Sequence, residues 1–179
     1  MANIFKACMN LTNKDKFKTY FNNVSNVDTH MTKNVEWGAV DYLAHSKYGL
    51  NGKEIEINSN MSFKTGFGSD GSSIYVLACY KTDSTVKLTE KSDYVNKYID
   101  VYDEYGLLKY GDAVFETSFS SSGLSSWFSD FSGFAPADRP IFIRGGDNYS
   151  GSGAGLFSFG YSDGSEGGND GFRPVCIVK

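Results

Sequence analysis

Apolar and aromatic side chains recur at helical spacing in two stretches near the N-terminus. In residues 12–23 and just beyond, they fall three or four positions apart, which predicts a helix with one aromatic face. The residues of this face are Phe17, Tyr20, Phe21 and Val24. The start of the helix has the pattern of a capping box, because Thr12 is followed three positions later by Asp15.

A second helix is predicted over residues 32–47. Thr32 is suited to cap it, Glu36 lies in the first turn, where the helix dipole favours a negative charge, and Gly49 suits its end. The spacing of the apolar positions also predicts which side chains are buried. They are Val35, Ala39, Tyr42 and Leu43.

Strand patterns follow the two helices. Residues 54–58 alternate between polar and apolar side chains, whereas residues 73–80 are almost continuously apolar and predict a strand buried on both faces. Three further apolar segments predict strands near the C-terminus, at 141–143, 156–159 and 175–178. Residues 60–72 and 82–93 have the composition of loops, and residues 94–105 fit helical spacing and strand alternation equally well.

A loop rich in Ser, Gly and aromatic residues is predicted over 118–138. It carries Trp127, Phe128, Phe131 and Phe134, so we expect it to pack on the domain rather than to extend into water. Two helices followed by short strands predict an α+β fold, and the length of 179 residues predicts a single domain over residues 1–179.

Charge and hydropathy narrow the range of partners. The net charge is −4 and there is no basic run, which argues against nucleic acid as the main partner. No apolar run is long enough to span a bilayer, so membrane insertion is not expected. Residues 1–6 do not have the pattern of a signal peptide. We therefore expect either a chain trimmed to a domain or one that reaches its destination without a secretion signal, as a virion component does.

Little in the sequence indicates catalysis, a metal or a cofactor, and none is expected. Cys79 and Cys176 lie in apolar runs, which predicts buried free thiols; one disulfide among these two and Cys8 is the alternative. His30 and His45 lie near the ends of the second predicted helix and are expected to be structural or solvated. Acidic and amide side chains in 163–170 offer oxygen atoms to calcium, but turn chemistry explains them and EF-hand spacing is absent.

The segment 147–170 lies between two anchors, Arg144-Gly145-Gly146 and Phe172-Arg173-Pro174-Val175. An apolar island, residues 154–159, divides it into loops 147–153 and 160–170. Tyr supplies contact area at low entropic cost, and Ser, Asn and Gly supply adaptable hydrogen bonds, as in antibody loops. We therefore predict a ligand-binding surface formed by Asp147, Asn148, Tyr149, Ser150, Tyr161, Ser162, Asp163, Ser165, Asn169 and Asp170.

The residues around this surface are expected to support it. Arg144 and Arg173 would hold the anchors through internal hydrogen bonds, because both lie beside glycines or core positions. The rings of Trp127, Phe128 and Phe131 are expected to pack on the domain, with a place at the edge of the binding surface as the alternative.

Three stretches of the chain, taken together, resemble one protein family. They are residues 30–40 continuing to 46–49, residues 110–113, and residues 142–146 through 155–159 to 172–175. The pattern is similar to the C-type-lectin fold in its formylglycine-generating-enzyme-like form, and within it to the variable proteins of diversity-generating retroelements on gut bacteria and prophages. This resemblance implies two helices packed on small antiparallel sheets with long Gly/Ser-rich loops. It also implies an additional N-terminal strand, for which only Ile4 to Met9 could serve.

The resemblance implies a non-catalytic receptor-recognition or adhesin domain with diversified C-terminal loops, on a phage tail or a bacterial cell surface. Its partner would be a protein or glycan on the surface of a host or neighbouring cell, and it could form part of a fibre or pilus. Retroelements of this kind randomise adenines, and changes in Asn codons reach Asn, Asp, Ser, Gly and Tyr, which the loops contain. Glu166 is not reached in this way.

Two alternatives compete with a diversified binding domain. An invariant structural module of a phage tail or pilus would carry the same loops as ordinary turns. The enzyme branch of the family oxidises a substrate thiol and would need a cysteine pair between the anchors to hold copper. Residues 147–170 contain no cysteine, which makes an oxidase the least favoured interpretation.

Overall fold

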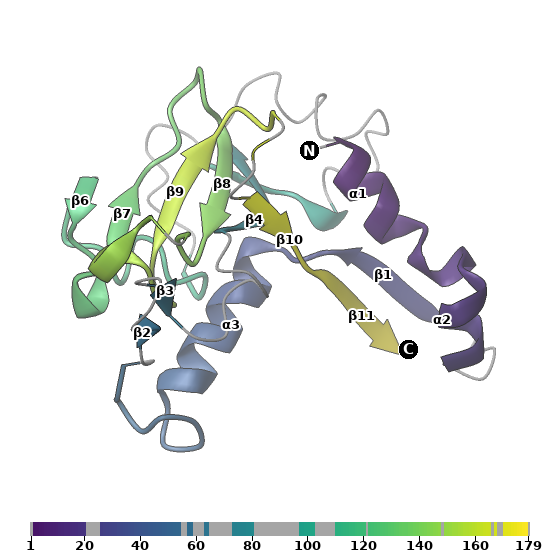
Figure 1. Ribbon diagram of the computed structural model, residues 1–179, viewed down its shortest axis with the longest axis horizontal. Helices are drawn as coiled ribbons and strands as arrows, with labels where there is room; N and C mark the ends of the chain where they lie inside the picture. The colour runs from purple at the N-terminus through teal and green to yellow at the C-terminus, as the bar shows by residue number, and fades with distance from the viewer. Residues whose placement is uncertain are drawn as a thin grey trace.

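Helices and strands form a mixed α+β fold, drawn in Figure 1. The computed structural model describes residues 2–20, 26–54, 57–58, 63–64, 73–80, 97–102, 110–120, 122–147, 149–165, 167 and 170–178. In this part of the chain the helices are α1 (Ala2–Met9), α2 (Asp15–Tyr20) and α3 (Asn34–His45), with 3-10 turns at Leu11–Asn13, Trp127–Ser129 and Gly151–Gly153. The strands are β1 (Val27–Met31), β2 (Ile57–Asn58), β3 (Phe63–Lys64), β4 (Ser73–Tyr80), β5 (Asp100–Tyr102), β6 (Ser122–Leu124), β7 (Phe131–Gly133), β8 (Ile141–Arg144), β9 (Phe159–Ser162), β10 (Asp170–Phe172) and β11 (Pro174–Val178).

Most of the described strands belong to one sheet, in the order β10-β4-β8-β9-β7-β6, with β5 paired to β4. β8 runs antiparallel to β4 and β9, whereas β10 and β5 run parallel to β4, and β7 runs parallel to β9. The expectation of antiparallel sheets is therefore wrong for this sheet, which is mixed. Two antiparallel pairs lie apart from it, β2 with β3 and β1 with β11.

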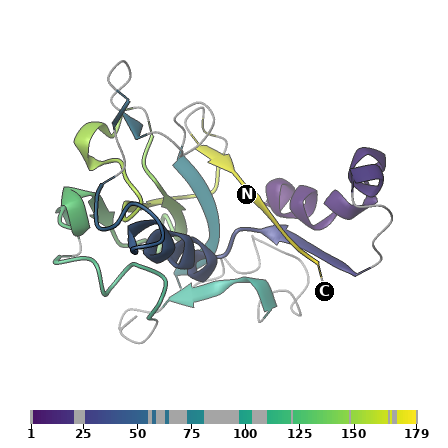
Figure 2. The same ribbon diagram turned by 90° about the horizontal axis from the view of Figure 1, so that it is seen from below.

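The large sheet has a separate hydrophobic core on each face. Neighbouring residues of a strand point to opposite faces, and in β8 Phe142 and Ile141 enter different cores. In Figure 2, α3 and α1 lie on either side of β4. The α3 core includes Trp37, Tyr102, Phe142, Phe157 and Phe159. The α1 core consists of Phe5, Cys8, Met31, Tyr98, Ile99 and Ile141.

A buried arginine joins α3 to the chain segments around it. The guanidinium of Arg144 donates to Asp41 Oδ2 at 2.8 Å and to the carbonyl of Ala113 at 3.3 Å, and both charged side chains are completely buried. It also approaches the carbonyl of Leu156 at 3.4 Å, which accepts the indole N–H of Trp37 at 3.0 Å. Because a buried charge without its partner is costly, this pair fixes how these segments meet.

α3 is confirmed, but its predicted start and cap are wrong. The helix begins at Asn34, and Lys33 is its N-cap residue, whose backbone N–H donates to the Glu36 carboxylate at 2.9 Å. Thr32 does not cap the helix, because its hydroxyl donates to the carbonyl of Arg173 at 2.8 Å. The Thr32 hydroxyl therefore bonds to the C-terminal anchor instead of capping α3.

The predicted buried face of α3 is also wrong. Its buried residues are Asn34, Trp37, Gly38 and Asp41, a stripe with spacing i, i+3, i+4, i+7. Of the residues predicted to be buried, Val35, Ala39 and Leu43 are exposed and Tyr42 is half-buried. Polar residues occupy the stripe because they have partners inside: the Asn34 amide donates to the Tyr102 hydroxyl at 2.7 Å, and Asp41 binds Arg144.

The N-terminal segment does not form the strand expected at residues 4–9 or the single helix expected over residues 12–23. Residues 4–9 belong to α1 and not to a strand, because Phe5 and Cys8, three positions apart, are both buried on one helical face. The predicted helix over 12–23 is divided, since a 3-10 turn ends at Asn13 and α2 starts at Asp15 and ends at Tyr20. Residues 21–25 lie outside the described residues, and among those described no helix is long and apolar enough to cross a membrane.

The strand predictions are largely confirmed in position. β4 and β8 match the predicted segments, and β2 falls within residues 54–58, of which 55–56 lie outside the described residues. In the ambiguous stretch 94–105, residues 100–102 form β5. β3 lies in the predicted loop 60–72, and β6 and β7 lie in the predicted loop 118–138, whereas 82–93 fall outside the described residues.

Two predictions near the C-terminus are wrong. Leu156 and Phe157 are buried in a turn, closed by the bond from the Ser158 N–H to the Gly155 carbonyl at 3.2 Å, and β9 begins only at Phe159. Cys176 is exposed and free, on a strand that pairs only with β1 among the described strands. Cys8 is a buried free thiol, and burial raises its pKa to about 11. The side chain of Cys79 lies outside the described set.

Asp28 of β1 and Glu36 of α3 hold His30 between them. His30 Nδ1 lies 3.1 Å from Asp28 Oδ1, and Nε2 lies 2.9 Å from Glu36 Oε1. Burial alone would lower the pKa of His30, but the hydrogen bonds and charges of Glu36 and Asp28 outweigh it and raise the pKa. Burial would raise the pKa of Glu36, but hydrogen bonds from His30 and Lys33 lower it. His30 is therefore structural, as expected.

Removing the buried arginine should destabilise the fold strongly. We expect Arg144→Met to lower the free energy of unfolding by about 3–5 kcal/mol, because Asp41 is left buried without its partner. Arg139→Met is the matched control: its guanidinium is 53% exposed, its ion pair with Asp138 spans 3.9 Å, and its loss should cost less than about 1 kcal/mol. Urea unfolding of both variants checks this, and equal costs would contradict a central role for Arg144.

The His30 network should give a pH-dependent contribution to stability. The raised pKa of His30 stabilises the fold below its ordinary pKa of 6.5, and this is lost as pH rises through the folded pKa. The lowered pKa of Glu36 stabilises above its ordinary pKa of 4.5, and this is lost as pH falls. The Tm difference between wild type and His30→Gln should therefore be largest between these two values. A difference that does not vary with pH would contradict the network.

Candidate functional site

The structure divides the predicted binding residues into two groups. Arg144 pairs with Phe159 at one end of the β8–β9 pair, and Ile141 pairs with Ser162 at the other. Residues 147–153 follow the first end and residues 163–165 follow the second, so the two loops leave opposite ends of the hairpin (Figure 1). Asn148 and Asn169 lie outside the described residues, and Asp170 belongs to β10.

The loop 147–153 is closed by its own side chains. Asp147 Oδ1 accepts bonds from the Tyr149 N–H at 3.0 Å and from the Ser150 hydroxyl at 2.7 Å. The Ser150 hydroxyl in turn accepts the Asp147 N–H at 3.0 Å. The Tyr149 side chain itself is 80% exposed. Hydrogen bonds that hold binding residues in place reduce the conformational entropy lost when a partner binds.

The double glycine positions this loop relative to the sheet. Gly145 and Gly146 have φ angles of 87° and 74°, in the left-handed region that favours glycine. A Cβ atom on Gly146 would lie 2.8 Å from the Cα of Ala154, so a larger residue would push the two ends of the loop apart. The Gly155 N–H then closes the loop by donating to the Gly145 carbonyl at 2.9 Å. Arg144 thus anchors the loop as expected, whereas Arg173 is exposed and contributes its backbone carbonyl to Thr32.

The second group surrounds an arginine outside the predicted segment. The Arg139 guanidinium lies 4.5 Å from the centre of the Tyr161 ring, in a cation–π contact. Asp163 accepts the Ser165 N–H at 2.8 Å, and the hydrogen bonds from the side chain and backbone of Ser165 lower the pKa of Asp163. Ser162 accepts the Gly164 N–H at 3.1 Å. Tyr161 and Ser162 are half-buried in β9, so this group offers less exposed area than the first loop.

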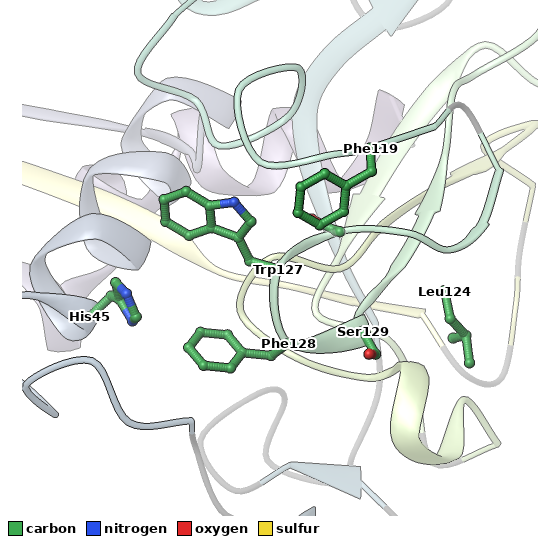
Figure 3. A pocket seen from close by; sticks show the side chains of 7 residues that line it. His45, Phe119, Leu124, Trp127, Phe128 and Ser129 are labelled. Atoms are coloured by element: carbon green, nitrogen blue, oxygen red, sulfur yellow. The ribbon is translucent and has the colours of Figure 1, made fainter.

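An open aromatic pocket of about 480 Å³ lies outside the predicted segment. Phe119, Trp127 and Phe128 line it in Figure 3, together with His45, Leu124, Ser126 and Ser129. Phe119 and Leu124 are 79% and 58% exposed. The sequence feature that corresponds to this pocket is the density of aromatic rings in residues 118–138, which predicts mainly packing on the domain.

Packing on the domain, the role expected for these rings, is found for Trp127 and Phe128. Trp127 and Phe128 pack on the buried Phe157, with ring centres 5.2 Å and 5.9 Å from it. His45, at the end of α3, packs against the same rings, at 5.6 Å from Trp127 and 5.2 Å from Phe128. The outer sides of Phe128 and Phe131 stay exposed. Residues that fix the loop to the core therefore also form a surface.

The aromatic pocket and the loop 147–153 lie against each other. A Cβ atom on Gly153, in the 3-10 turn of this loop, would lie 2.8 Å from Leu124 Cδ2, which lines the pocket, and 3.4 Å from Phe131 Cβ. The loop therefore adjoins the pocket at Gly153 and Leu124. The predicted binding residues do not include those that line the pocket.

The buried charge pair of Asp41 with Arg144 is enclosed in the core. No group of three or more His, Cys, Asp or Glu side chains suited to a metal ion occurs in the described part of the chain. No family model, curated protein or solved structure matches the chain.

Proposed function

We propose that the chain is a non-catalytic ligand-binding domain whose binding surface consists of the loop 147–153 and the aromatic pocket. The observation that carries this proposal is a loop that exposes Tyr149 and adjoins, through Gly153 and Leu124, a pocket with exposed rings. Exposed apolar area of this kind is disfavoured in water unless a partner covers it. Tyr and Trp are also the side chains that contribute most often to binding energy at interfaces.

The same proposal includes a C-type-lectin fold of the formylglycine-generating-enzyme-like form. Support comes from the three stretches that carry the resemblance, because they meet at one buried group. The first supplies Trp37, whose indole N–H donates to the Leu156 carbonyl, and Asp41 directly follows its residues 30–40. The second supplies the carbonyl of Ala113, and the third supplies Arg144 and the carbonyl of Leu156. A sequence pattern whose distant parts share one hydrogen-bond network is the pattern expected of a fold-defining contact.

In this proposal the domain is a variable protein of a diversity-generating retroelement, acting as a receptor-recognition or adhesin domain. It would lie on a phage tail or a bacterial cell surface and bind a protein or glycan of a host or neighbouring cell. Loop 147–153 is the better candidate for diversification, because its side chains bond to each other and leave the core untouched. The group around Tyr161 would act as a second contact area.

An invariant structural module of a tail or pilus is the second candidate. The observation that favours it is β11, whose residues Ile177 and Val178 are exposed although they are apolar. Within the described residues β11 pairs only with β1, so its other edge is open to pair with a neighbouring strand in an assembly.

Tyr149 should contribute strongly to binding. The labelled domain is screened by flow cytometry on a panel of bacterial and animal cells, and Tyr149→Ala is then measured on the cells that bind. We expect a loss on the order of tenfold or more, the size of an interface hot spot. Tyr20→Ala is the matched control, because Tyr20 is 86% exposed on α2, far from the loop in Figure 1, and its loss should leave binding unchanged. Wild-type binding by Tyr149→Ala, with an unchanged melting curve, would refute this surface.

The genome around the coding sequence separates the two candidates. A diversified domain should have a nearby near-copy of the DNA for its C-terminal segment, differing mainly at adenines, together with a reverse transcriptase gene. Sequencing the coding region in many isolates should then show changes at codons 147–153 and none at the codon for Arg144. Identical loops in all isolates would favour the structural module.

A further inference from the structure

The rings of the aromatic pocket surround one open space, and this inference about their ligand rests on the binding role proposed above. Phe119 projects toward the pocket from one side in Figure 3, and Trp127 and Phe128 line the other. Three aromatic rings around one space form the arrangement that recognises methylated ammonium groups, because the face of each ring is electron-rich. The pocket volume of about 480 Å³ exceeds such a group, so a larger ligand can project through the open side.

The pocket offers few hydrogen bonds. Its polar lining residues are His45, Ser126 and Ser129, and the Ser126 hydroxyl is already directed to the hydroxyl of Thr117 at 3.2 Å. A sugar ring needs several side-chain partners for its hydroxyl groups, since unpaired polar groups in a pocket are costly. A ligand group without hydrogen-bond donors matches this lining better.

Charge distinguishes a cation from a neutral apolar group. No Lys or Arg is among the described residues that line the pocket, and the whole chain carries a net charge of −4, so the long-range field attracts cations. A neutral alkyl group would gain only from burial, whereas a quaternary ammonium also gains from contact with aromatic rings. We propose that the aromatic pocket binds a quaternary ammonium group, such as the choline head group.

The backbone holds the cage in shape. Phe128 and Ser129 have φ angles of 62° and 61°, in the left-handed region that residues other than glycine rarely adopt. Such conformations persist only where the surroundings determine them, and they occur at ligand sites more often than elsewhere. Here the bond from the Ser129 N–H to the Ser126 carbonyl at 3.1 Å and the packing of Phe128 on Phe157 fix the turn.

A fluorescence titration tests the proposal directly. Trp127 lines the pocket, whereas the other tryptophan, Trp37, is buried and bonded to Leu156, so a change in emission on binding reports on Trp127. The protein is titrated with choline chloride at constant ionic strength and, in parallel, with 3,3-dimethylbutanol, the neutral isostere of choline. We expect choline to bind at least about tenfold more tightly, in line with the cation–π contribution. Equal binding of both compounds, or of neither, would overturn the proposal.

Two substitutions of one residue sharpen the test. Phe119 is 79% exposed, so Phe119→Leu and Phe119→Trp should leave the melting curve unchanged. Phe119→Leu keeps an apolar side chain without a ring and should weaken choline binding several-fold, whereas Phe119→Trp should retain it. Wild-type affinity in Phe119→Leu would show that the pocket recognises apolar bulk and would overturn the proposal.

Two further measurements determine the source of the quaternary ammonium group and the specificity of its binding. Sedimentation with phosphatidylcholine vesicles, but not with phosphatidylglycerol vesicles, would assign the group to a lipid; choline binding without sedimentation would assign it to a soluble or polymer-linked choline. Tyr20→Ala, the control outside the proposed surface, should leave choline affinity unchanged. If choline fails to bind but the Tyr149 result holds, the proposed binding surface stands and only its quaternary ammonium ligand is wrong.

Discussion

The enclosed Arg144–Asp41 pair is the constraint on which the rest of the structure depends. One guanidinium holds α3 through Asp41, the segment after residue 110 through Ala113, and the turn before β9 through Leu156. The cost of enclosing a charge is recovered only when all of these partners are in place. The correct packing of α3 on the sheet and the correct position of the loop after Arg144 therefore form together.

This constraint also explains where sequence patterns succeeded and failed. The strands β4 and β8 were predictable because a continuous apolar run admits few other structures. The buried face of α3 was not predictable, because Asn34 and Asp41 are polar. Polar side chains indicate a solvent-facing position until their partners, here 68 and 103 residues away, are known. The apolar side chains of Val35 and Leu43, which are exposed, favoured the wrong face. Periodicity ranks positions by hydropathy and carries no information about distant hydrogen-bond partners.

In the candidate site, too, local features could be predicted from the sequence, whereas features that depend on distant contacts could not. Tyr149 and Ser150 were predicted from local composition, and they lie on an exposed loop whose order depends on bonds within three residues of chain. The pocket was missed because Phe119, Leu124 and Trp127 meet only after β6 and β7 pair and Phe157 is inserted beneath them. The separation of Tyr161 from Tyr149 was likewise invisible, since it follows from the register of β9 on β8.

The self-contained bonding of loop 147–153 has a consequence for the evolution of the chain. The side-chain bonds of Asp147 and Ser150 join residues of the loop to one another, and two glycines with positive φ lie between the loop and β8. A mutation at Tyr149 is therefore tested by selection for what it recognises and hardly at all for whether the protein folds. The residues behind it have no such freedom. The molecule thus combines a mutationally robust, evolvable tip with a core in which a single lost partner is penalised.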